Sequence, residues 1–146
     1  MRHKLKVAIP IALSVIFIGI GSSLIPTTKI PINMLNSQVT QANIKDTICK
    51  SGWTATIRPP SSYTTNLKKQ QLANKSDKDP THYEEDHWIP LELGGNPTDQ
   101  HNLWPELWPD AHKKDVKENA NHKAVCDGTI TLEKAQLDMY TNWGPR

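Results

Sequence analysis

The sequence lacks the patterns that mark several common classes of protein. Its two cysteines lie far apart and form no Cys-x-x-Cys pair, which argues against a zinc ribbon. No His-Glu-x-x-His pattern is present, which excludes the zinc metalloproteases that depend on it. There is no internal repeat and no low-complexity tract, and 146 residues are enough for one domain. The chain therefore predicts a single small domain with a targeting segment in front of it.

The first 25 residues predict an export signal. Three basic residues precede Val7, and the stretch from Val7 to Ile25 carries no charge. A basic start followed by an apolar run is typical of a signal peptide, although the run is also about as long as a membrane span. We therefore expect residues 1–25 to be a cleaved signal peptide, with an uncleaved membrane anchor as the alternative. In either case the remainder lies outside the cytoplasm, secreted or periplasmic.

The remainder of the chain lacks a strong excess of charge of one sign. All 15 acidic residues lie at Asp46 or later, whereas three of the 17 Lys and Arg residues belong to the basic start. This leaves 14 basic side chains against 15 acidic ones, a net charge of −1. Non-specific attraction to phosphate groups would therefore have to come from local patches of lysine. The alternative is that these lysine runs are ordinary solvated faces. The two runs are Lys68, Lys69, Lys75 and Lys78, and Lys113, Lys114, Lys117 and Lys123.

The two cysteines, Cys49 and Cys126, predict a disulfide. An even number of cysteines in an exported chain favours pairing, because the outer compartments are oxidising. The bridge would close a long loop and stabilise the fold by about 4 kcal/mol on the chain-entropy estimate. The alternative is a pair of buried free thiols.

Residues 26–46 are polar, contain proline and show no periodicity, so we interpret them as a flexible linker before a domain at 47–146. In the first part of that domain, residues 53–59 alternate β-branched and small side chains and predict a short strand. Residues 61–74 predict a short helix with Leu67 and Leu72 on its inner side.

The second part of the domain predicts a hairpin-like unit and two helices. A strand is expected over 86–89, a turn needing positive φ at Gly94-Gly95, and an irregular returning arm over 96–107. Proline and aspartate before residue 111 and a glycine at 128 predict a helix over 110–125. A last helix follows Thr131, its N-cap, with Leu132, Ala135, Leu137 and Met139 available for packing. The fold class is α+β.

The stretch "DHWIPLELGG…NLW" resembles the HNH endonuclease motif. More narrowly, the chain from Cys49 to about Trp143 resembles a group of small exported bacterial HNH-type proteins. The resemblance implies a ββα-metal core with an extra N-terminal strand region and a C-terminal helix. It also implies that His87 is the general base, that Asp86 is a metal ligand, and that Asn102 pins the loop and orients the histidine. Adjacent strand residues point to opposite faces, so His87 can reach the water while Asp86 holds the metal, provided that the backbone is bent locally.

A further metal ligand is expected on the helix over 110–125. At 100° per residue, Asp115, Asn119 and His122 share one stripe and Glu118 points elsewhere. We rank Asp115 first, Asn119 second and His112 third, and the alternative is a solvated polar face. Aspartate or asparagine ligands suit Mg²⁺ or Mn²⁺, whereas a histidine ligand would favour Zn²⁺ or Ni²⁺.

These features predict a monomeric, divalent-metal-dependent endonuclease that hydrolyses DNA, or RNA, with low sequence specificity. The alternative is a catalytically weak or silent HNH-fold protein that acts as an extracellular binding or structural module. Glu85 stands where the resemblance implies an apolar residue, and it would attract a cation but repel phosphate. Three tryptophans crowd the motif and could stack on bases, although at least two are expected to wall the core: Trp88, Trp104 and Trp108.

Overall fold

A computed structural model describes residues 29–145, so the expected signal segment at 1–25 lies outside the described part of the chain. The elements follow in the order η1 (Ile32–Met34), η2 (Gln41–Asn43), α1 (Trp53–Ile57), α2 (Ser61–Leu72), η3 (Pro80–His82), β1 (Tyr83–His87), η4 (Leu91–Leu93), β2 (Leu103–Leu107), α3 (Trp108–Cys126) and α4 (Leu132–Asn142). The predicted α+β class is confirmed. The order β1, β2, α3 is compatible with the ββα unit that the resemblance implies.

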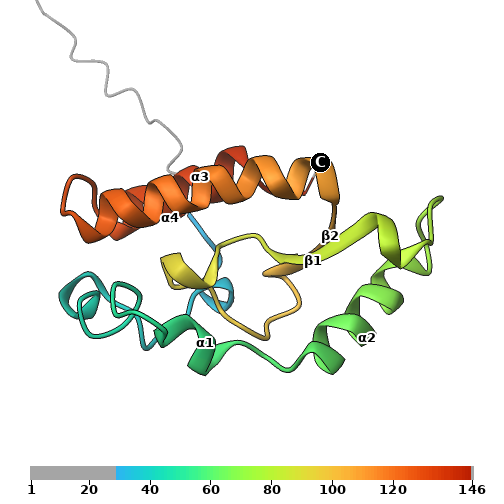
Figure 1. Ribbon diagram of the computed structural model, residues 1–146, viewed down its shortest axis with the longest axis horizontal. Helices are drawn as coiled ribbons and strands as arrows, with labels where there is room; N and C mark the ends of the chain where they lie inside the picture. Colours follow the sequence, from blue (N-terminus) through green and yellow to red (C-terminus); the bar gives the residue numbers. More distant parts are fainter. Residues whose placement is uncertain (1–28, 146) are drawn as a thin grey trace, which may run out of the picture.

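The hairpin of β1 and β2 lies between two groups of helices. Figure 1 shows α3 and α4 side by side along one side of it, with α1 and α2 on the other. The two strands pair antiparallel, with Asp86 opposite Trp104 and His87 opposite Leu103. The strand expected over 86–89 therefore begins and ends earlier, and the returning arm contains a regular strand. Pro105 is tolerated there because a two-stranded sheet has only edge strands.

The strand expected over 53–59 is wrong, because Trp53–Ile57 forms the helix α1. Gly52 precedes it with φ of 79°, a conformation that admits a sharp entry into the helix. The helix ends where the prolines begin, since Arg58 is extended ahead of Pro59. The β preference of the threonines is overridden by this context. The extra N-terminal strand region is accordingly absent from residues 29–145.

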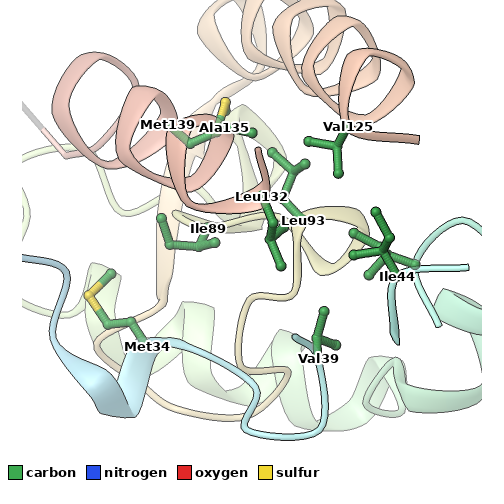
Figure 2. Close-up of a cluster of buried hydrophobic side chains, with 10 residues drawn as sticks. Met34, Val39, Ile44, Ile89, Leu93, Val125, Leu132, Ala135 and Met139 are labelled. Carbon is green, nitrogen blue, oxygen red and sulfur yellow. The ribbon is translucent and has the colours of Figure 1, made fainter. Parts of the chain in front are cut away.

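The segment expected to be a flexible linker at 26–46 packs against the rest of the domain over the residues that the structure describes, from 29 onward. Met34, Val39 and Ile44 are buried, and Figure 2 shows them facing the side chains of η4 and α4. The Asn36 amide donates to the Gly94 carbonyl at 2.9 Å, and the Asn96 amide donates to the Met34 carbonyl at 2.8 Å. The segment turns through short 3-10 pieces, so its buried residues follow no regular period.

The two C-terminal helices largely follow the prediction. The Thr131 hydroxyl accepts from the Lys134 amide at 3.2 Å, which confirms it as the N-cap of α4. Leu132, Ala135 and Met139 are buried, whereas Leu137 is 37% exposed. Within residues 29–145, no helix combines the length and the apolar character needed to cross a membrane.

The Cys49–Cys126 disulfide is confirmed. It joins the loop that follows η2 to the last residue of α3. A disulfide is compatible with an extracellular location, because such bonds persist in oxidising compartments.

Candidate functional site

Asn102 holds the loop between β1 and β2 in place. Its side chain is fully buried and accepts from the Ile89 amide at 2.7 Å. It also donates to the carbonyl oxygens of Ile89 at 3.0 Å and Asn96 at 2.9 Å. Gly95 lies against the same point, since a Cβ there would be 1.8 Å from the Ile89 oxygen. The loop is thus fixed by one buried amide and by a backbone approach that only glycine permits.

Asp86 and His87 face opposite sides of the hairpin, as strand alternation predicts. His87 lines a groove between the hairpin and the start of α2. Asp86 points instead to α3, where its Oδ2 accepts from the Lys114 ammonium at 2.7 Å. Its other oxygen, Oδ1, accepts from the His87 amide at 2.7 Å. One strand therefore separates a histidine in a groove from a carboxylate in a buried cluster.

The His87 imidazole is held in one tautomer. Its Nε2 lies 3.1 Å from the Pro97 carbonyl oxygen. A carbonyl can only accept, so Nε2 carries the proton and Nδ1 keeps a free lone pair. Burial lowers the pKa of His87, and the bond to Pro97 opposes this only in part. The ring is thus a neutral base near pH 7. The sequence reasoning gave the orienting role to Asn102, whereas the structure gives it to Pro97.

The groove beside His87 has a volume of about 320 Å³. One wall comes from the first turns of α2, with Ser61, Thr64 and Thr65. The Lys68 ammonium is engaged by the carbonyl oxygens of Pro80 and Tyr83. Arg58 is exposed and has no ion pair among the described residues, so its guanidinium is available to an anion in the groove.

Two acidic residues also line this groove, Glu84 and Glu85. Both carboxylate oxygens of Glu85 are buried without a hydrogen-bond partner in the described part of the chain. Burial raises the pKa of Glu85 to about 7, although the nearby Lys68 opposes the shift. A protonated Glu85 carries no charge to repel an anion in the groove, whereas an ionised Glu85 at higher pH does.

Lys114 is the cation of the buried cluster behind the hairpin. Its side chain is fully buried, and its ammonium donates to the His87 carbonyl at 2.8 Å as well as to Asp86 and Glu118. Burial opposes the charge, but the Asp86 and Glu118 carboxylates prevail and raise the pKa of Lys114. A charged lysine therefore lies between two carboxylates out of contact with water.

The cluster holds more carboxyl groups than one ammonium can neutralise. Burial and a hydrogen bond to Asp86 raise the pKa of Glu106 to about 8. Burial also raises the pKa of Glu118 to about 7, against the attraction of Lys114. Glu106 is 5% exposed, and its Oε2 has no hydrogen-bond partner among residues 29–145. The cluster is thus rich in oxygen donors and short of positive charge.

The helix residues predicted as ligands do not join this cluster. Asp115 and Asn119 are exposed, and the Asn119 amide donates to the Asp115 backbone oxygen at 2.8 Å. His112 is exposed beside the Trp108 ring, with ring centroids 5.6 Å apart. Glu118 points away from the exposed Asp115 and Asn119, as expected, and it is Glu118 that contacts Lys114 in the cluster.

The buried face of α3 is formed by other residues than the predicted stripe. The side chains that face the hairpin and α4 recur every three or four residues, as on any buried helix face. Sequence reasoning missed this stripe because a lysine, a glutamate and an asparagine interrupt the apolar positions. The stripe comprises Ala111, Lys114, Glu118, Asn121 and Val125.

The tryptophans of the motif take separate roles. Trp88 packs against the main core and stacks on Tyr140, with ring centroids 4.6 Å apart. Trp108 is 39% exposed and lines the groove beside His87. Trp104 is half-buried, and its indole nitrogen has no partner in the described range. Of these three, Trp88 packs against the main core.

Comparison of the chain with protein-family models, with curated proteins and with solved structures finds no match.

Proposed function

We propose that the chain is an HNH-type, divalent-metal-dependent endonuclease that hydrolyses DNA phosphodiester bonds with low sequence specificity. The observation that supports this best is the setting of His87. A buried, neutral imidazole, whose Nε2 is engaged by the Pro97 carbonyl, lines a groove that Arg58 also lines. The neighbouring Asp86 belongs to an oxygen-rich cluster behind the same strand.

In this proposal His87 is the general base. Its Nδ1 takes a proton from the attacking water, while the bond from Nε2 to Pro97 keeps the ring oriented. Arg58 and the hydroxyl groups of α2 bind the phosphate oxygens. These contacts address the backbone and not the base edges, which accounts for low sequence specificity. RNA offers the same phosphodiester, and the choice of DNA follows the motif resemblance.

The cluster behind β1 fits a divalent cation. Asp86, Glu106 and Glu118 offer carboxylate oxygens, and the unpartnered Glu106 Oε2 is a ready donor. Hard oxygen ligands suit Mg²⁺ or Mn²⁺. Glu106 and Glu118 here take the role that sequence reasoning gave to Asp115 and Asn119. A metal ion in phosphodiester hydrolysis neutralises charge at the phosphate and the leaving oxygen, and an ion in this cluster would do so only for a phosphate that reaches the Asp86 side of β1.

One observation favours the second candidate, a catalytically silent HNH-fold binding protein in the extracytoplasmic space. The Lys114 ammonium already lies between Asp86 and Glu118, where it supplies the positive charge that a metal ion would otherwise provide. If a metal ion never displaces the Lys114 ammonium from these carboxylates, the protein would bind its partner without cleaving it.

The test is plasmid nicking by the purified protein with Mg²⁺, Mn²⁺, Ni²⁺ or Zn²⁺, against an EDTA control. We expect nicking that EDTA abolishes and that His87→Gln lowers by at least ~100-fold, the usual contribution of a general base. His112→Gln, an exposed histidine on α3, is the matched control and should retain activity. Absence of nicking with every metal refutes the endonuclease and favours the binding protein. Full activity of a folded His87→Gln variant instead refutes the assignment of His87 as the general base.

A further inference from the structure

The last turns of α3 bring a second group of metal-ligating side chains together. His122 and Cys126 lie one helical turn apart, and the disulfide brings Cys49 beside them. One donor atom from each of these three residues lies within 4.8 Å of the others. All three are only partly buried, so a small reagent can reach them. This group is separate from the cluster around Lys114.

The His122 ring is oriented as a ligand would be. Its Nε2 lies 2.8 Å from the Ile48 carbonyl oxygen, so Nε2 carries the proton and Nδ1 keeps its lone pair. Metal-bound histidines usually donate their other ring N–H to such an oxygen. Nδ1 lies 3.6 Å from a carboxylate oxygen of Glu92. The second oxygen of that carboxylate is buried and has no partner in the described part of the chain.

We propose that, when the Cys49–Cys126 bond is reduced, Cys49, Cys126, His122 and Glu92 form a site for a thiolate-preferring divalent ion such as Zn²⁺. Two sulfurs, one imidazole nitrogen and one carboxylate oxygen match the four-coordinate sets in which zinc is held. The disulfide and the metal exclude one another, because the sulfurs ligate as thiolates and the disulfide has none.

The reduction balances with an external dithiol. Two electrons from the dithiol break the sulfur–sulfur bond, the dithiol closes to its own disulfide, and two Cys thiols result. Metal binding then releases two protons from these thiols. The ion would tie the loop after η2 to the end of α3 in a reducing compartment, where disulfides are rare. This proposal stands whether or not the chain cleaves DNA.

The test is a titration of the full chain with Co²⁺, which reports thiolate ligation by charge-transfer absorption. The reduced chain should bind one Co²⁺ that gives this absorption, and the oxidised chain should show no such absorption. His122→Gln and Glu92→Gln should each weaken Co²⁺ binding by at least ~10-fold. Loss of a group that only orients a metal ligand already costs about 10- to 100-fold in metal affinity. The control His112→Gln lies on the same helix, outside the group, and should bind as the wild type does.

Helix content is followed by circular dichroism in the same samples. If reduction unfolds the chain, Co²⁺ should restore the helix signal in the wild type, because the metal binds only the folded arrangement. No charge-transfer absorption in the reduced chain overturns the proposal. So does binding without recovery of helix, or binding that is as tight in His122→Gln as in the wild type.

Discussion

Replacing Lys114 by methionine tests the buried cluster most directly. Methionine keeps most of the side-chain length and removes the charge and the hydrogen bonds. Asp86, the His87 carbonyl and Glu118 would all lose their shared donor. Since the lysine side chain is fully buried and the two carboxylate side chains are 14% exposed, water cannot easily take its place.

The expected loss is about 3 kcal/mol in the free energy of unfolding near pH 7. Breaking a buried ion pair by removing one partner typically costs about 3–5 kcal/mol. The lower end applies because the pKa of Glu118 is raised to about 7, so this group is partly protonated and has less need of a cation. Asp86 also keeps the hydrogen bond from the His87 amide. In melting temperature the loss corresponds to roughly 12 °C, at ~4 °C per kcal/mol for a domain of this size.

The assay is urea unfolding followed by tryptophan fluorescence, repeated with and without Mn²⁺. Lys113→Met is the matched control, because its ion pair with Asp110 is exposed and should contribute at most ~1 kcal/mol. Mn²⁺ should stabilise Lys114→Met more than the wild type, where the ion competes with the ammonium. At a hundredfold excess over the dissociation constant, the gain is about 2.7 kcal/mol.

Two results contradict this reasoning. A loss below ~1 kcal/mol in Lys114→Met, comparable to the exposed control, means that the ammonium is not needed to hold the carboxylates together. Equal stabilisation of Lys114→Met and the wild type by Mn²⁺ means that the ion binds elsewhere, and the cluster then loses its assignment as the metal site.

Three further predictions follow from the same contacts. Asn102→Ala removes three hydrogen bonds from a fully buried amide and should cost at least ~3 kcal/mol in urea unfolding, whereas the exposed Asn119→Ala should change stability by less than ~0.5 kcal/mol. The folded-state pKa of Glu106 is raised to about 8. The wild type should therefore lose stability relative to Glu106→Gln as the pH rises from ~5 to ~8, by up to ~1.4 kcal/mol per pH unit. Parallel plots of stability against pH for the two proteins would disprove the shift. In plasmid nicking, Glu118→Gln should lower activity by at least ~10-fold and Asp115→Asn should not, since only Glu118 reaches the cluster; the reverse ranking would return the ligand role to Asp115.

Local signals were enough to predict the hairpin and the later helices. Pro109 and Asp110 begin α3 and Thr131 caps α4, and each acts within one or two turns of its own position. Gly94 adopts the positive φ that the turn requires, at 75°. These residues act through backbone geometry, which is the same in any tertiary context.

The parts that could not be predicted depend on contacts between distant segments. Met34 and Val39 are buried because η4 and α4 cover them, and nothing near them in the sequence shows this. The inward face of α3 was misassigned because Lys114 is ordinarily a surface residue. Its burial depends on Asp86, 28 positions earlier in the chain.

The pairing of β1 with β2 has a consequence for chain length. Side chains alternate along a strand. A single residue inserted ahead of Glu85 would therefore move the strand side chains that precede the insertion to the opposite face of the hairpin, while Asp86 and His87 would stay in place. An insertion between His87 and Asn102 that shifted β1 by one residue would instead turn the imidazole into the acidic interior and the carboxylate into the groove. Insertions or deletions at the exposed turn around Gln100 should therefore be tolerated only if the Asn102 side chain can still hydrogen-bond to the Ile89 backbone. The positions at which insertions are not tolerated would thus identify the residues that fix the register of the two strands.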